Sequence, residues 1–150
     1  MEAFEILRSR DRDLRLLIAG FDDKPSQRHY GVEFVGNVSN EKLGALYAQS
    51  DCFVMPSRFE AYGLVFPEAL ACALPCVGRN AFEMQHFIED GVTGRLVSSD
   101  QPEELAEAMM DCLTNSQIRQ NVIDGASDVA EHYSWDAVAD RIYRSIEQND

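Results

Sequence analysis

The chain has 150 residues, of which 45% are hydrophobic, and a chain of this length suits one domain that buries roughly 70% of its extended surface around a single core. Its formal net charge of −13 argues against nucleic acid or an anionic membrane as the main partner, because both require a concentrated basic face. No apolar run approaches the ~20 residues that span a bilayer, and Met1 to Arg10 lack the apolar stretch of a secretory signal, so we expect a cytoplasmic protein.

Short apolar runs alternate with helical patterns along the first half of the chain. A helix is expected around Phe4 to Leu7, and Ser39 or Asn40 is placed to cap a second helix. The predicted elements are a helix through Phe4, Ile6 and Leu7, a strand from Leu14 to Ala19 ending at Gly20, a strand from Val32 to Val35 ending at Gly36, a helix from Glu41 to Gln49 and a strand from Cys52 to Met55.

The second half begins with a helix expected within a residue or two of Pro67, since proline favours the first helical turn. The further predicted elements are a strand over Pro75, Cys76 and Val77, a helix from Glu83 to Glu89, a strand from Gly94 to Val97, a helix from Pro102 through Leu113, a helix from Ser116, and a last helix capped by Ser134. The last helix carries an apolar stripe of Trp135, Val138, Ile142 and Ile146, which predicts core packing or contact with a neighbouring domain.

The strands are short and apolar on both faces, which is typical of a parallel sheet covered by helices on two sides. Together with the alternation of strands and helices, this predicts a doubly wound α/β domain with a mostly parallel sheet.

The cysteines and histidines do not have the spacing of a metal site. Cys52, Cys72, Cys76 and Cys112 lie in apolar or helical surroundings, so we expect them to be reduced core residues. A zinc site requires paired ligands, whereas the three histidines, His29, His86 and His132, are scattered. No metal and no separate cofactor is therefore predicted.

The segment from Phe59 to Glu68 has the clearest chemical pattern, with Glu60 and Glu68 on either side of Gly63. A helix start leaves unpaired amide hydrogens and a partial positive charge, which favour a phosphate at the carboxyl end of a parallel strand. Carboxylates repel a phosphate, so the two glutamates are better explained as acceptors for neutral hydroxyls, as on a ribose or a sugar ring. A sugar nucleotide has both parts.

These residues also have simpler interpretations. Glu68 in a first helical turn is favoured by the helix dipole alone, and a single glycine such as Gly63 is more often a turn residue than a ligand contact. An anionic donor also needs cations, and the candidates near the segment are Arg58, Arg79 and Arg95.

The same segment resembles the donor-binding signature of the family 4 glycosyltransferases, which are retaining enzymes of the GT-B fold. The resemblance is carried by Pro56, Ser57, Phe59, Glu60, Tyr62, Gly63, Pro67, Glu68, Ala69, Leu70, Ala71, Cys72, Pro75 and Val77. It extends over nearly the whole chain through Leu16 to Gly20, Phe34 to Gly36 with Val38, Glu89 to Val97, and Ser134 with Trp135.

The resemblance implies a role for each matching position. Glu68 would accept hydrogen bonds from the ribose hydroxyls of the nucleotide, and Glu60 would lie beside the donor sugar and support the charge that develops at its anomeric carbon. Val38 would pack near the base, and the diphosphate would meet the backbone of Gly63, Leu64 and Val65. Such enzymes use no metal and rely on positioning and on electrostatic stabilisation.

The sequence departs from the family in its cations and its domains. Family members carry an arginine and a lysine on the first strand and following loop of this domain, and Met1 falls inside the helix that should come after them. We therefore expect residues 1–150 to form a single donor-binding domain without its first strand and without the amino-terminal acceptor domain, with weak donor binding and no turnover of its own. A missing strand would expose strand edges and apolar surface, so self-association is expected.

A smaller departure lies at Phe82 to His86, where the family often has two glycines and a glutamate near the donor sugar. Arg58, Arg79 and His86 are the candidates for contacts with the donor sugar or phosphate in their place. For Arg79, a solvated position on a loop is the simpler account.

The sequence is compatible with three functions. The first is the nucleotide-sugar half of a glycosyltransferase that acts on a saccharide or lipid acceptor, in the cytoplasm or at the membrane periphery. The second is a non-catalytic α/β binding or assembly module, and the third is a sugar-nucleotide epimerase, which the form of the glutamate segment disfavours.

Overall fold

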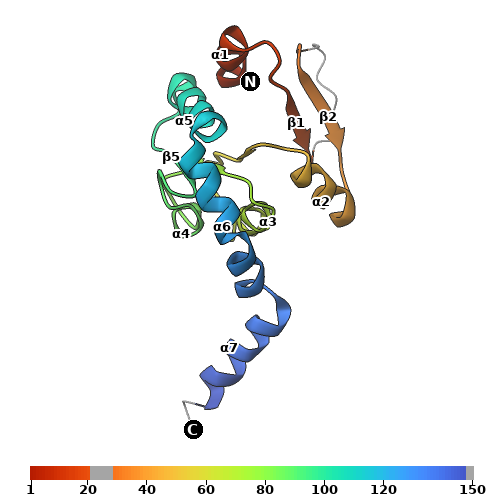
Figure 1. Ribbon diagram of the computed structural model, residues 1–150, viewed down its shortest axis with the longest axis vertical. Helices are drawn as coiled ribbons and strands as arrows, with labels where there is room; N and C mark the ends of the chain where they lie inside the picture. The colour runs from red at the N-terminus through yellow and green to blue at the C-terminus, as the bar shows by residue number, and fades with distance from the viewer. Residues whose placement is uncertain (21–28, 148–150) are drawn as a thin grey trace.

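The strands of the computed structural model, which describes residues 1–20 and 29–147, lie in two parallel sheets (Figure 1). All pairings between the described strands are parallel, so the predicted α/β class with parallel strands is confirmed, although the strands are divided between two sheets. One sheet pairs β1 (Leu16–Ala19) with β2 (Val32–Gly36), and the other has the order β3 (Phe53–Val54), β4 (Cys76–Arg79) and β5 (Gly94–Val97).

Helices precede β1, connect β2 to β3, β3 to β4 and β4 to β5, and form the carboxyl-terminal third of the chain. In chain order they are α1 (Glu2–Arg10), α2 (Asn40–Ala48), α3 (Val65–Ala71), α4 (Met84–Phe87), α5 (Pro102–Thr114), α6 (Ser116–His132) and α7 (Trp135–Glu147).

Three of the helix starts are fixed by side chains of the residues before them. The Ser39 hydroxyl accepts a hydrogen bond from the Lys42 amide at the start of α2, and the Ser134 hydroxyl accepts one from the Ala137 amide at the start of α7. Both caps were predicted from the sequence. The side-chain oxygen of Asn115 caps α6 in the same way, which satisfies amide hydrogens that have no partner within the helix.

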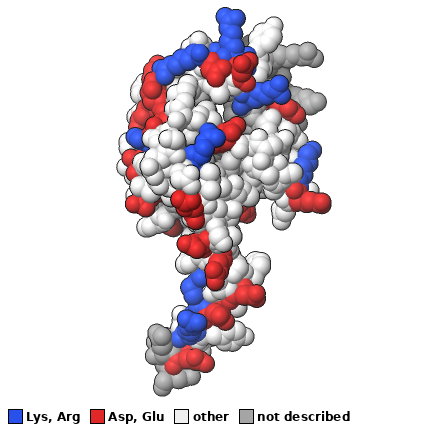
Figure 2. Space-filling view, viewed as in Figure 1, with Lys and Arg blue, Asp and Glu red and all other residues white. Residues whose placement is uncertain are grey.

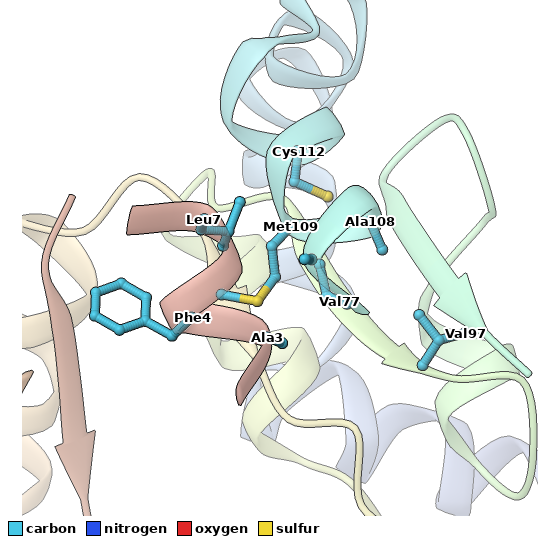
Figure 3. Packing of buried hydrophobic residues seen from close by; sticks show 9 residues of the cluster. Ala3, Phe4, Leu7, Val77, Val97, Ala108, Met109 and Cys112 are labelled. Atoms are coloured by element: carbon cyan, nitrogen blue, oxygen red, sulfur yellow. The ribbon is translucent and has the colours of Figure 1, made fainter. Parts of the chain in front are cut away.

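Two apolar clusters cover opposite faces of the β3–β4–β5 sheet. Neighbouring residues of a strand point to opposite faces, and Val77 belongs to one cluster whereas Cys76 belongs to the other. α1 and α5 form the first cluster with the sheet (Figure 3), through Ala3, Phe4, Leu7, Val77, Val97, Ala106, Ala108, Met109 and Cys112. The second cluster comes from α2, α3, α4, α6 and the sheet, through Tyr47, Phe66, Ala69, Leu70, Leu74, Cys76, Met84, Ile88 and Val122. Helices therefore lie on both faces, as predicted.

Burial differs sharply between the strands. Cys76, Val77 and Gly78 of β4 are buried, whereas β1 and β3 contain only half-buried or exposed residues. A central strand of a parallel sheet is paired on both edges and covered on both faces. Within the described residues, β1 pairs only with β2 and β3 only with β4, so each of them has an unpaired edge.

Two local predictions are wrong. The helix expected over Glu83 to Glu89 covers only Met84–Phe87, because Ile88 is extended and buried and the Glu89 carbonyl accepts the amides of Val92 and Thr93 in a turn. Cys72 is exposed at the end of α3 and is not a core residue, whereas Cys76 and Cys112 are buried as expected.

The core-packing interpretation of the last helix is also wrong. None of the residues of α7 is buried, and the side chain of Trp135 is 87% exposed. Figure 1 shows the reason, since α7 extends away from the body of the molecule and follows α6. The other interpretation, contact of this stripe with a neighbouring domain, stays a prediction. No helix among the described residues has both the length and the apolarity needed to cross a membrane.

The close pairing of β4 and β5 leads to a stability prediction at Gly94. A Cβ at this position would lie 1.9 Å from the backbone oxygen of Cys76, whereas a Cβ at Gly125 in α6 would meet nothing within 4 Å. We expect Gly94→Ala to lower the free energy of unfolding by about 3 kcal/mol or more, because the clash is with backbone. Gly125→Ala should raise it by about 0.5–1 kcal/mol, since alanine favours a helix interior. Urea denaturation measures both, and equal midpoints for the two variants would contradict the observed register.

Candidate functional site

The Phe59–Glu68 segment connects the carboxyl end of β3 with the start of α3, which is the location predicted for it. The Phe66 amide donates to the Gly63 carbonyl, and α3 begins at Val65, two residues before Pro67. Gly63 has a φ of +63°, and an added Cβ would lie 3.2 Å from the Phe66 ring and 3.3 Å from the Phe87 ring. Glycine is therefore required here by the turn itself, whether or not a ligand approaches it.

The Glu60 carboxylate closes this turn. Its Oε1 atom accepts a hydrogen bond from the Gly63 amide at 3.1 Å and a longer one from the Tyr62 amide at 3.4 Å. The Gly63 amide, which was predicted to meet a diphosphate, thus already has an acceptor in this structure. For the amides of Leu64 and Val65, no acceptor is found in the described part of the chain.

The Glu68 carboxylate is exposed in the first turn of α3 and has one partner across the fold. The hydroxyl of Tyr47 donates to Glu68 Oε2 at 3.2 Å. Tyr47 is buried on α2, and its pKa is raised by burial and by the negative charge of Glu68. Tyr47 was not predicted as a site residue, although a buried tyrosine hydroxyl usually has a polar partner.

The other residues predicted to contact the donor come from other parts of the chain. Val38 is half-buried and comes two residues before the start of α2, the helix that carries Tyr47. His86 is exposed on α4, and no described contact joins it to either glutamate. The rings of Phe59 and Phe82 lie edge to face at 5.4 Å, which brings the start of the 82–86 stretch beside the segment.

Asp100 pairs with both arginines that were candidates for the donor phosphate or sugar. The Arg58 guanidinium lies 3.0 Å from Asp100 Oδ2, and Arg79 bonds Oδ1 of the same carboxylate. The hydrogen bond from Arg79, supported by Arg58, holds the pKa of Asp100 below its usual range. Arg95 is paired as well, with Asp90 and Asp111. Asp100 was not predicted as a site residue. The available signal was its position shortly after β5, because Arg79 is the last residue of the adjacent strand β4 and the carboxyl ends of adjacent parallel strands meet at one edge.

A cavity of about 360 Å³ lies elsewhere, at the amino ends of β1 and β2. It is lined by side chains of both charges, among them Arg8, Arg12, Arg15, Asp13 and Glu33. The glutamate segment lies at the carboxyl end of β3, so its residues do not line this cavity. In residues 1–20 and 29–147, no group of three or more histidines, cysteines and carboxylates is placed to hold a metal ion.

Basic side chains are interspersed with carboxylates on the face of the molecule shown in Figure 2. They do not gather into one region of that face, in keeping with the net charge of −13.

Comparison with known proteins identifies the family. Residues 1–115 match the family model described as "Glycosyl transferases group 1". The chain belongs to this family.

Two curated relatives cover most of the chain. The phosphatidyl-myo-inositol mannosyltransferase of Mycobacterium leprae (strain TN) is 28% identical over 142 residues, which are 90% of this chain and 38% of the relative. The alpha-D-kanosaminyltransferase of Streptomyces kanamyceticus is 30% identical over 161 residues, which cover 97% of this chain and 41% of the relative. The chain thus spans about two fifths of these two relatives.

Solved structures confirm the GT-B type of fold. The pneumococcal O-GlcNAc transferase GtfA, solved in complex with UDP and GlcNAc, superposes with a TM-score of 0.80 at 20% identity over 98% of this chain and 32% of that chain. The sucrose-phosphate synthase of Thermosynechococcus elongatus superposes with a TM-score of 0.77 at 26% identity over 99% of this chain and 42% of that chain. As predicted, the chain is a Rossmann-like domain of a group 1 glycosyltransferase.

The shared pairing of Asp100 predicts how the charge of this surface can be changed. Asp100→Asn leaves Arg58 and Arg79 without their carboxylate, so we expect inorganic pyrophosphate to bind roughly fivefold more tightly, equivalent to about 1 kcal/mol. Glu107→Gln is the matched control, since Glu107 is likewise an exposed carboxylate bonded to an arginine, Arg10. Isothermal titration of both variants checks the expectation, and equal affinities would show that the two arginines do not face an anion site.

Proposed function

We propose that this chain is the donor-binding domain of a retaining glycosyltransferase, which transfers a sugar from a nucleotide-sugar to a saccharide or lipid acceptor. One observation carries the proposal: the exposed Glu68 carboxylate lies one helical turn from the Gly63 bend, at the carboxyl end of a parallel strand in a group 1 glycosyltransferase. Ligands of open α/β folds bind at this edge. The relatives named above transfer mannosyl and kanosaminyl groups, and the solved O-GlcNAc transferase contains UDP.

The proposed roles follow from what each group can do chemically. Glu68 is an acceptor for ribose hydroxyls, because an ionised carboxylate only accepts hydrogen bonds and one of its oxygens, Oε1, is not used by Tyr47. The free amides of Leu64 and Val65 are donors to the diphosphate, and Val38 packs near the base. Glu60 lies beside the sugar and stabilises the positive charge of an oxocarbenium-like state, without a metal ion.

The unpaired strand edges support a larger parent domain. α1 leads directly into β1, and a right-handed crossover would place a preceding strand parallel to β1, on the edge away from β2. A strand there would be central, which accounts for the half-burial of β1 and β3 in this chain. We propose that such a strand and an acceptor domain complete the enzyme and bring the missing cations, and that residues 1–150 alone do not turn over.

The pairing of Asp100 favours a second candidate, a non-catalytic binding or assembly module. Arg58 and Arg79, which lie at the carboxyl ends of the strands, both bond Asp100, and Arg95, near the amino end of β5, bonds Asp90 and Asp111. The described surface therefore offers the diphosphate none of these three arginines unpaired. This candidate predicts that nucleoside diphosphates do not bind.

Titration with nucleoside diphosphates separates the two candidates. We expect uridine, guanosine or adenosine diphosphate to bind weakly, and Glu68→Gln to reduce the affinity about tenfold, because hydrogen bonds to a charged acceptor are lost. Glu103→Gln is the control, since Glu103 is also an exposed glutamate in the first turn of a helix, α5. Isothermal titration calorimetry with and without EDTA measures the affinities and the need for a metal. Absence of heat at millimolar ligand would reject donor binding by this chain.

The exposed edges and the apolar face of α7 predict self-association of the isolated chain. Light scattering coupled to gel filtration should give a mass above 16.9 kDa that rises with concentration. Ile142→Ser together with Trp135→Ser removes exposed apolar surface from α7 and leaves the strand edges unchanged. Loss of self-association in this double variant would show that α7 mediates it, and persistent self-association would show that the strand edges do. A monomer at all concentrations contradicts the prediction.

A further inference from the structure

Tyr47 is held rigidly between three elements of the fold. Its backbone belongs to α2, and its ring lies edge to face on Phe53 of β3 at 5.8 Å. Phe53 in turn lies edge to face on Phe66 of α3 at 5.5 Å. The side chain is 7% exposed, so the position of its hydroxyl is set by packing and not by solvent.

The partner of that hydroxyl has no comparable support. Glu68 is exposed, and its carboxylate is joined to the rest of the described structure through the bond from Tyr47 to Oε2. A glutamate side chain has several rotatable bonds, so a free carboxylate on a helix surface samples many positions. A rigid donor on one oxygen restricts the rotation of the carboxylate and narrows the range of positions that Oε1 samples.

We propose that Tyr47 is a positioning residue for ribose recognition, which holds Glu68 so that its second oxygen accepts the hydroxyls of a ribonucleoside diphosphate. The inference rests on the proposed donor-binding function and adds the residue that orients the acceptor. Tyr47 remains a donor throughout the neutral range, because burial and the adjacent carboxylate raise its pKa. A purely structural role is the alternative, in which the bond only satisfies a buried hydroxyl and joins α2 to α3.

Tyr47→Phe tests the inference, since it removes one oxygen and keeps the ring that packs on Phe53. Affinities are measured by calorimetry for the ribonucleoside diphosphate that binds most tightly and for its 2′,3′-dideoxy analogue, after circular dichroism has shown that the variant is folded. We expect the variant to bind the ribonucleotide about fivefold more weakly and the dideoxy analogue unchanged. Tyr143→Phe, at an exposed tyrosine of α7, is the matched control and should change neither affinity.

The double variant Tyr47→Phe with Glu68→Gln adds a second readout. If the tyrosine acts through the glutamate, the double variant binds the ribonucleotide no more weakly than Glu68→Gln alone. The positioning role is overturned if Tyr47→Phe loses affinity equally for both ligands, or for neither. Donor binding by this chain still stands in that case, provided that Glu68→Gln lowers the affinity for the ribonucleotide. If Glu68→Gln also has no effect, or if no nucleoside diphosphate binds, the proposed function fails and the inference fails with it.

Discussion

The burial of Phe66 is the constraint on which the candidate site depends. Phe66 is fully buried, stacks on Phe87, meets Phe53 edge to face and lies under the Gly63 turn. This packing anchors the first turn of α3 at the carboxyl edge of the sheet. Glu60 and Glu68 are therefore held on either side of the Gly63 turn. The Glu60 carboxylate completes the turn by accepting the Gly63 amide. The turn geometry and the two carboxylates that are proposed to contact the donor therefore lie within the same ten residues.

The arginines nearest the glutamate segment are bonded to a carboxylate, in a chain whose net charge is −13. Asp100 bonds Arg58 and Arg79 at the carboxyl ends of the strands, where an anionic donor would need positive charge, whereas Asp90 and Asp111 bond Arg95 near the amino end of β5. An acidic domain can bind a diphosphate only if amides or cations outside this set contribute. The unpaired edges of β1 and β3 indicate where a further strand would fit. Electrostatics and sheet topology thus lead to the same proposal, that the complete site includes residues beyond this chain.

Much of the fold could be predicted because local signals agreed with each other. The strand runs are short and apolar, and Ser39 and Ser134 are cap residues placed directly before helical patterns, so these element positions were correct to within a few residues. The predictions failed where tertiary packing determines the end of a helix or the burial of its apolar face. α4 ends early because Ile88 is drawn into the core, and the apolar stripe of α7 lies in solvent because the helix leaves the body of the molecule.

By itself, the sequence determined the fold class, the family resemblance and the position of the Glu60–Glu68 segment between a strand and a helix. These depend on periodicity, on turn residues and on the spacing of a short segment, all of which are local. Only the tertiary structure joined Tyr47 to Glu68 and placed Asp100 between Arg58 and Arg79. Both contacts link residues at least 21 positions apart in the chain. Tyr47 and Glu68 meet because α2 and α3 pack in one apolar cluster on the same face of the sheet, and Asp100 meets the arginines because parallel strands align their carboxyl ends at one edge.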